Sequence, residues 1–499
     1  MTYRFGPFAL DGVGYRLTRE GVEIPLSPKL IDLLLHLLQR PGALVTKDEL
    51  LTAIWPDVTV TENALTRAVS EVRQALEDAP GAPAYIQTVA RRGYRFIGQV
   101  VADTAAAPAT VGAGRAGATG FIPLARARET SSLDAFRELT EGRLQLESLD
   151  AAGVPAAIEH FARAIQLDPR YALAHVGLAN ARFWRYELSR EHNVPDTDAL
   201  AAAIADARLA IELDPHLAEA HATLAFLLVS AARFPEAQRA AARAVELEPG
   251  YWGHYFRLGH ASWGEARLQA LGTALELYPD FAFAHFEIAM VWIARGRLDQ
   301  AEAVLREGLV VLERQVGRRE RFPASGLHWM LALVRLARGD RDEAVRQLEA
   351  ETATGGDRLY AREFDMASLN ALGAVALGAG DRAEAVRRYQ AALALDPAHA
   401  RARVGLALAT GSAEHLARAR EAVDTLARGP RGQETTLLRA MLLAARGGAD
   451  EALDLLSGLI AEAPAGFTGW TIPIEPLLAP VRALPKYRAL AAALAARAA

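Results

Sequence analysis

Apolar residues alternate with polar or small ones at the start of the chain. This period of two runs from Tyr3 to Leu10 and returns from Val22 to Leu26, which predicts short antiparallel strands. Two later alternating runs, Tyr85 to Val89 and Tyr94 to Val100, are joined by Ala90-Arg91-Arg92-Gly93. We therefore expect a hairpin there, with glycine supplying the turn.

Three segments between these strands have helical spacing and clear helix starts. Ser27 precedes a proline at the first helical position, Thr46 and Glu49 have the spacing of a capping box, and Thr61 precedes a longer helix. The apolar residues of this third helix form one stripe: Leu65, Val69, Val72 and Leu76. Strands, three helices and a terminal hairpin predict one small α+β domain at residues 1–100.

Polar side chains that suit DNA contacts gather on the third helix and the hairpin. The helix face opposite the apolar stripe offers groups that could reach base edges in a major groove, and Arg73 on its flank is expected to hold a phosphate. Solvated charges would explain any one arginine equally well, but the joint arrangement favours DNA. The residues that we expect to contact DNA are Asn63, Thr66, Arg67, Ser70, Arg73, Thr88, Arg91 and Arg92.

The chain repeats itself from residue 133 onward. Leucine, an acidic residue and proline recur together, as at Pro215 and Pro249, which lie 34 residues apart, and small residues precede these prolines at fixed offsets. This pattern looks like the tetratricopeptide repeat, in which helix pairs stack into a superhelix. Other spacings depart from it, so the register between residues 250 and 365 stays open.

The predicted fold class is multidomain and mainly α, a small α+β domain followed by an all-α solenoid. We expect the first domain at 1–100, a flexible linker rich in Ala, Gly, Thr and Pro at 101–132, the repeats at 133–475 and a capping segment at 476–499.

Residues 1–100 resemble the OmpR/PhoB-type winged-helix family. The strings that carry the resemblance are IPLSPKLIDLLLHLLQRPGALVTKDELLTAIWPD, ENALTRAVSEVRQALED and YIQTVARRGYRF. The resemblance implies that the helix from Thr61 is the recognition helix and that residues 85–98 are the wing. It also implies that the loop from Pro56 to Val60 can contact RNA polymerase, as in some family members.

The sequence departs from the family pattern in two respects. Ala90 stands where the family often has arginine after the Thr-Val of the wing, so Arg91 or Arg92 would take over that contact. Many relatives carry a phosphorylated receiver domain first, whereas here the DNA-binding pattern begins at residue 3, so we do not expect phosphorelay control. The layout resembles the branch in which tetratricopeptide repeats follow the winged helix directly.

The composition of the chain excludes several kinds of site. The chain has no cysteine, which removes disulfides, thiol nucleophiles and cysteine-bound metals. We see neither a signal peptide nor an apolar run long enough for a membrane span, so we expect a cytoplasmic protein. The net charge is −5, yet the segment from Tyr85 to Phe96 has three arginines and no acid, so a nucleic-acid contact must be local.

Two motifs suggest other functions but are better explained by structure. The GxGxxG string at 112–117 follows no convincing strand, so we expect no nucleotide cofactor. His175, His221 and His285 each lie six residues after a repeat proline, which favours a recurring packing position over a metal site. No pair of carboxylates stands in an apolar setting, so we do not expect an enzyme.

Two functions remain. The favoured one is a transcription regulator that binds double-stranded DNA and is controlled by an unknown protein, peptide or small ligand docked on the repeats. The alternative is a repeat scaffold whose winged helix contacts only proteins.

Overall fold

The computed structural model describes most of the chain as two compact units. The described residues are 2–11, 16–19, 22–24, 26, 28–54, 62–76, 78, 83–89, 92–103, 130, 132–147, 152–191, 195–315, 324–353, 360–427, 432–464 and 466–499. Those of the N-terminal unit end at Asp103, and those of the C-terminal unit begin at Thr130. Most of the predicted linker and the whole GxGxxG string lie outside the described residues.

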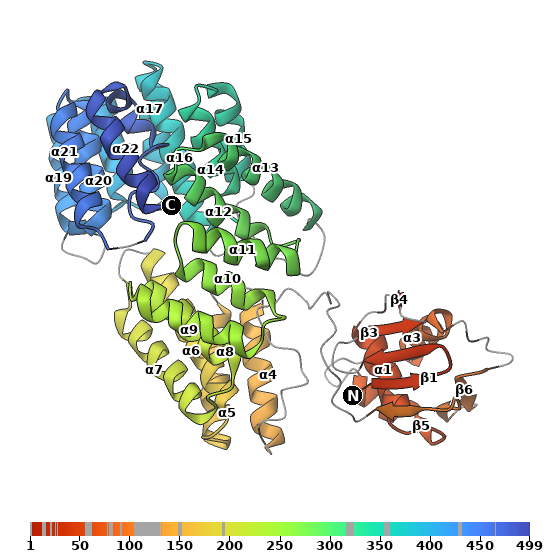
Figure 1. The fold of residues 1–499 in the computed structure, drawn as a ribbon. Coiled ribbons are helices and arrows are strands. Elements are labelled where there is room, and N and C mark those ends of the chain that lie inside the picture. The colour runs from red at the N-terminus through yellow and green to blue at the C-terminus, as the bar shows by residue number, and fades with distance from the viewer. Residues whose placement is uncertain are drawn as a thin grey trace. The chain divides into compact units, whose positions relative to one another are not determined.

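A five-stranded antiparallel sheet of order β4-β3-β2-β1-β8 opens the N-terminal unit (Figure 1). Its strands are β1 (Thr2–Phe5), β2 (Phe8–Asp11), β3 (Arg16–Arg19), β4 (Val22–Ile24) and β8 (Val101–Asp103). Tyr3 pairs with Leu10 and Phe5 with Phe8, and all four side chains are buried, as the alternation predicts. Because β8 pairs with β1, the domain continues past residue 100, where we predicted its end. A strand of three residues is too short to show a period.

Three helices and a second sheet complete the unit, where the sequence predicts three helices and a hairpin. These elements are α1 (Pro28–Leu38), α2 (Lys47–Ile54), α3 (Glu62–Ala75), β5 (Leu44–Thr46), β6 (Ile86–Val89) and β7 (Gly93–Phe96). The second sheet has the order β5-β7-β6. Phe8 of the first sheet, Leu34 of α1, Leu65 of α3 and Phe96 of the second sheet belong to one buried cluster. Burial of this shared core therefore fixes the helices against both sheets.

The capping box at the start of α2 has the predicted geometry. The Thr46 amide donates to Glu49 Oε2 over 2.8 Å, and the Glu49 amide donates to Thr46 Oγ1 over 3.2 Å. Hydrogen bonds from the amide and the hydroxyl of Thr46 lower the pKa of the Glu49 carboxyl. The box fixes the turn that leads from β5 into α2.

In the C-terminal unit, the described residues form nine consecutive helix pairs (Figure 1). The first four pairs are α4 (Leu133–Glu147) with α5 (Gly153–Leu167), α6 (Ala172–Glu191) with α7 (Thr197–Leu213), α8 (Ala218–Ser230) with α9 (Phe234–Leu247), and α10 (Trp252–Ala261) with α11 (Glu265–Leu277). The other five are α12 (Ala282–Ala294) with α13 (Leu298–Gln315), α14 (Leu327–Ala337) with α15 (Arg341–Ala353), α16 (Ala361–Gly378) with α17 (Arg382–Leu395), α18 (Ala400–Thr410) with α19 (Ala413–Ala427), and α20 (Gly432–Ala445) with α21 (Ala449–Glu462).

Small residues let the helices of this array approach closely. The alanines predicted to lie between paired helices are fully buried: Ala157, Ala164, Ala237, Ala244, Ala385 and Ala392. Glycines also clamp two aromatic rings. A Cβ atom on Gly142 or Gly177 would come within 2.7 Å or 2.3 Å of the Phe161 ring, and Gly373 and Gly405 enclose the Tyr389 ring in the same way. The spacing of small residues therefore reflects tight packing, as predicted.

The first helix of most pairs also packs against the first helix of the next pair, which makes these helices the inner layer of the array. Their histidines recur in one environment. His175 Nε2 lies 3.1 Å from the Pro169 carbonyl oxygen, and His221 Nε2 lies 3.0 Å from that of Pro215. In these two pairs the recurring histidine therefore contacts the turn that precedes its own helix.

The segment predicted to cap the array does more than cover its end. It forms the 3-10 helix η2 (Pro476–Ala483) and α22 (Pro485–Arg497). α22 packs against α21 of the last pair, as a cap would, but it also contacts α12, and η2 contacts α14 and α16. Such long-range contacts leave no periodic signal in the sequence.

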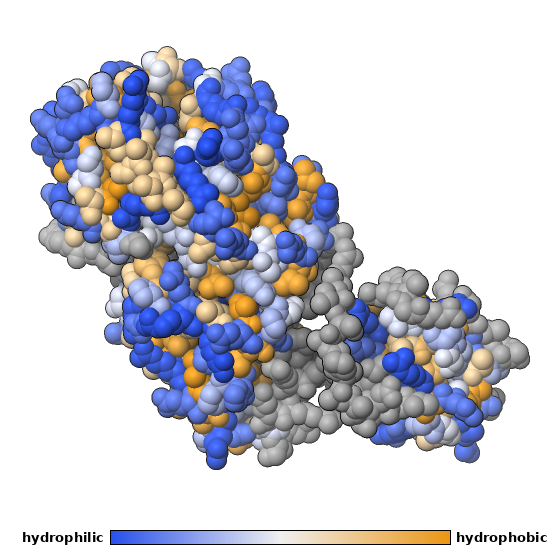
Figure 2. Space-filling model, viewed as in Figure 1, coloured by the Kyte–Doolittle hydropathy of each residue, from blue (hydrophilic) through white to orange (hydrophobic). Residues whose placement is uncertain are grey.

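Within the described ranges, none of the helices combines the length and the apolar character that a membrane span requires. On the face of the array that Figure 2 displays, hydrophilic residues are interspersed with smaller hydrophobic areas. In the same described part of the chain, no group of three or more His, Asp or Glu side chains could hold a metal ion.

Candidate nucleic-acid interface

Helix α3 has one buried face and one outward face. The predicted stripe of Leu65, Val69, Val72 and Leu76 is at most 2% exposed, whereas Ser70 is exposed. The helical register places positions 63, 66 and 67 on the same side as Ser70, opposite the stripe. The backbones of Asn63, Thr66 and Arg67 lie within α3, but their side chains lie outside the described residues.

Arg73, which we predicted to contact a phosphate, is engaged inside the domain. Its side chain is buried at 8% exposure, and Nη2 donates to the Ile86 carbonyl oxygen over 2.7 Å and to Thr88 Oγ1 over 2.8 Å. The prediction failed because residues 13 and 15 positions away in sequence, on β6, fold over this flank of the helix. Arg73 therefore attaches the hairpin to α3 from inside the domain.

Asp78, which the sequence analysis missed, makes a second link between α3 and the hairpin. Its side chain is buried, and its two oxygens accept hydrogen bonds from the amides of Ala84 (2.5 Å), Tyr85 (3.2 Å) and Ile86 (2.8 Å). An acidic residue just after a helix and a few positions before a strand was the available signal. Charge-assisted bonds of this kind are about twice as strong as neutral ones.

Strands β6 and β7 form the predicted wing beside α3. They pair antiparallel from Ile86 with Phe96 to Val89 with Gly93. Thr88 and Arg92 are exposed, so the structure brings these two predicted contacts to the surface of the hairpin. Arg91, expected at its tip, lies outside the described residues, as does the predicted polymerase loop from Pro56 to Val60.

Backbone contacts hold the base of the wing turn in place. The Arg92 amide donates to the Val89 carbonyl oxygen over 3.0 Å, and the Lys47 amide donates to the Arg92 carbonyl oxygen over 3.1 Å. Gly93 has φ +156°, and a Cβ atom there would lie 2.0 Å from the Val45 carbonyl oxygen. Only glycine fits this close approach to β5. The hydrogen bond from Lys47 anchors the wing turn to the start of α2.

Two sheets and three helices, followed by a hairpin that packs beside the third helix, define a winged-helix domain. Residues 21–96 match the family model described as "Transcriptional regulatory protein, C terminal". The N-terminal unit is therefore an OmpR/PhoB-type winged-helix DNA-binding domain.

The curated relatives that share this domain are transcriptional regulators and activators. The chain is 37% identical over 87 residues to the transcriptional activator CadC of Escherichia coli strain K12, a match that covers 17% of each protein. It is 34% identical over 93 residues to the transcriptional regulatory protein AfsQ1 of Streptomyces coelicolor, which covers 18% of this chain and 41% of the relative. The chain thus spans less than half the length of these relatives.

A similar domain has been solved in a complex. The Klebsiella pneumoniae RstA DNA-binding domain, in complex with the RstA box, is 30% identical to the matched part of this chain. The match covers 19% of this chain and 96% of that one, with a TM-score of 0.18.

Proposed function

We propose that the protein is a transcription regulator that binds a specific double-stranded DNA site and is controlled through its helical array. One observation carries the proposal. α3 buries its apolar stripe and turns its other face, with Ser70, outward beside the wing. A helix that turns its polar face outward, with a hairpin next to it, can enter a major groove while the hairpin follows the backbone.

In this binding mode the residues divide into two groups. Asn63, Thr66, Arg67 and Ser70 on α3 contact base edges, with arginine suited to the two acceptors of guanine. Thr88, Arg91 and Arg92 on the wing contact the minor groove or phosphates, which position the protein without reading sequence. Arg73 is left out of both groups because its guanidinium is engaged inside the domain.

Control is assigned to the helical array because stacked helix pairs offer a long surface for a partner. A protein, a peptide or a small ligand bound there would alter DNA occupancy or contact with RNA polymerase, the latter through the Pro56 to Val60 loop. The ligand on the array and the contact with RNA polymerase are both proposed from the resemblance to the winged-helix family. Binding to chromosomal DNA would place the action of the protein in the cytoplasm.

The test is to sequence the genomic fragments that the purified full-length chain retains. We expect a shared motif among them. The Arg67→Ala variant should lose discrimination at one position of that motif, by about 1–3 kcal/mol. Arg137→Ala is the matched control, since it removes an exposed arginine from α4 of the other unit. If no fragment is enriched over random DNA, the scaffold that contacts only proteins becomes the better account.

A further inference from the structure

The chain between α21 and α22 packs onto the helix pairs without forming a helix pair itself. We call residues 466–484 the strap. Its described backbone hydrogen bonds are turns within the strap, for example from the Trp470 amide to the Phe467 carbonyl oxygen and from the Ile474 amide to that of Thr471. Side chains, rather than a shared backbone ladder, therefore attach the strap to the array.

Phe467 is the first anchor of the strap. Its ring centroid lies 5.7 Å from that of Phe234, at the start of α9, and 6.3 Å from that of Trp263, between α10 and α11. The guanidinium carbon of Arg267 lies 6.0 Å from the centre of the Phe467 ring. Arg267 is itself buried and donates to backbone carbonyls at the end of α10 and in the turn after it, so this cation is held in place for the ring.

Trp470 and Ile474 are the next anchors, on the inner helices. The Trp470 ring lies 6.4 Å from Phe286 of α12 and 6.5 Å from Trp329 of α14, in both cases edge to face. Ile474 is fully buried in the hydrophobic cluster that α12, α14 and α16 share. Phe286 and Trp329 lie more than 130 residues before Trp470 in sequence.

A buried ion pair ends this series. Arg401 Nη1, at the start of α18, lies 2.6 Å from Glu475 Oε2, and the Glu475 side chain is 4% exposed. Arg482 of η2 donates to the Glu475 carbonyl oxygen over 2.6 Å. A carboxylate buried to this degree needs its cation, so Arg401 selects for an acid at this position.

The far end of α22 returns to the middle of the array, where Figure 1 shows it beside α12. Arg295 Nε, just after α12, donates to the Ala498 carbonyl oxygen over 2.7 Å. Gly264 has φ +65°, and a Cβ atom there would lie 2.5 Å from the Ala499 oxygen. The strap thus lies between α21 and α22, and the far end of α22 is held against the α11–α12 region.

We infer that the strap is a displaceable intramolecular ligand. The surface that it covers accepts a partner segment that adopts the same series of turns, with two aromatic residues three positions apart and a carboxylate five positions after the second, the pattern of Phe467, Trp470 and Glu475. This inference rests on the proposed function, since such a segment would be the partner that controls the array. A tethered ligand has an effective concentration of the order of millimolar, so the strap excludes weak competitors until its own anchors loosen.

The test uses a fluorescent peptide with the sequence of residues 464–478, PAGFTGWTIPIEPLL. Full-length chain with Phe467→Ala and Trp470→Ala together should bind it at least tenfold more tightly than the unsubstituted chain, by fluorescence anisotropy. A peptide with both aromatic residues replaced by alanine should bind the same variant at least tenfold more weakly. Equal affinity of the variant and the unsubstituted chain, with helical circular dichroism retained, would overturn the inference.

The milder Glu475→Gln variant decides the matter if the double variant does not fold. It should bind the peptide at least threefold more tightly than the unsubstituted chain, and adding Arg401→Gln should remove the preference for the peptide with glutamate over one with glutamine. Leu144→Ala, at an exposed position on α4, is the control and should leave peptide affinity unchanged. No gain in Glu475→Gln would contradict the inference. Because no DNA is present, a failure here is distinct from a failure of DNA binding.

Discussion

Arg73 illustrates how one buried side chain positions a surface for binding. Its guanidinium reaches from α3 to the carbonyl oxygen of Ile86 and the hydroxyl of Thr88, the second of which is exposed on the wing. Asp78 accepts three amides from the chain that leads into the same strand. Together they fix the angle between α3 and the wing, and this angle decides whether both can meet one DNA duplex.

Replacing Arg73 with glutamine should therefore loosen the wing without removing a DNA contact. Hydrogen bonds to a charged group contribute about 1.5–3 kcal/mol, so amide exchange in β6 should become roughly ten to a hundred times faster. Hydrogen-exchange mass spectrometry of the full-length chain measures this. Arg92→Ala, on the exposed side of the hairpin, should leave β6 exchange unchanged. Unaltered exchange in Arg73→Gln, together with a weaker salt dependence of DNA binding, would restore the phosphate role.

At the scale of single residues, the sequence predicts burial and capping that depend on local spacing. It does not predict hydrogen bonds to residues that are distant in sequence. Leu65 and Val69 are buried as the helical stripe requires, and the bonds between Thr46 and Glu49 follow from their spacing. Arg73 was misplaced because its hydrogen-bond partners belong to a strand that packs on it only in the folded domain. Asp78 was missed for the same reason.

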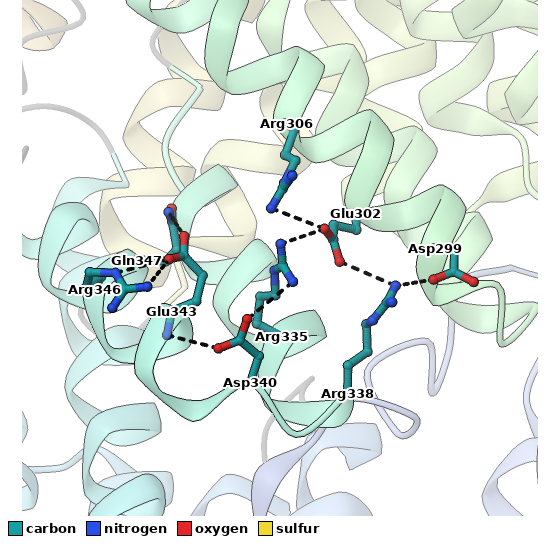
Figure 3. Close-up of polar contacts among 9 residues, drawn as sticks. All are labelled: Asp299, Glu302, Arg306, Arg335, Arg338, Asp340, Glu343, Arg346 and Gln347. Carbon is teal, nitrogen blue, oxygen red and sulfur yellow. Dashed lines mark hydrogen bonds and ion pairs between the residues drawn. The ribbon is translucent and has the colours of Figure 1, made fainter.

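At the scale of elements, ion pairs connect one helix pair to the next. Figure 3 shows Glu302 of α13 among three arginines. The shortest contact is with Arg335 of α14, whose Nη2 lies 2.7 Å from Glu302 Oε1; Arg306 lies at 3.3 Å and Arg338 at 3.4 Å. The Glu302 side chain is only 13% exposed and Arg335 16%, so this contact is partly shielded from water.

Glu302→Gln should therefore destabilise the array by about 1 kcal/mol, since it leaves Arg335 without its carboxylate on that side, while the two more exposed arginines contribute little. Urea unfolding followed by circular dichroism at 222 nm measures the change. Glu343→Gln is a suitable control because the pairs of Glu343 with Arg346 and Gln347 stay within α15 (Figure 3). If both substitutions had the same effect, Glu302 would not connect the pairs.

The prediction of helices succeeded where the sequence carries a clear signal for the end of a helix. Proline after an acidic residue marks the ends of α5, α7, α9 and α17, and the structure has helix ends there. The strap escaped prediction because Phe467 and Trp470 have no periodic neighbours, and aromatic residues in a coil segment do not reveal which helices they will contact. The three-residue strand β8 escaped for a simpler reason, its length.

At the scale of the whole molecule, each unit has its own task in this account. The N-terminal unit supplies a helix and a wing for DNA, and the C-terminal unit supplies a long helical surface whose inner helices are partly covered by the chain itself. In the proposed function, a partner segment that displaces the strap would alter DNA occupancy. The account depends on the first step, which is DNA binding by α3 and the wing.

The most direct measurement of that step is the affinity of the full-length chain for the DNA motif found among its bound genomic fragments, measured at several salt concentrations. Each phosphate contact releases counterions, so the logarithm of the affinity should fall by about 0.9 per contact for each decade of salt. Arg92→Ala should reduce the slope by about 0.9 and weaken all sequences alike, whereas Arg137→Ala should leave it unchanged. A slope near zero, or one that Arg137→Ala reduces as much as Arg92→Ala does, would contradict DNA binding through the wing.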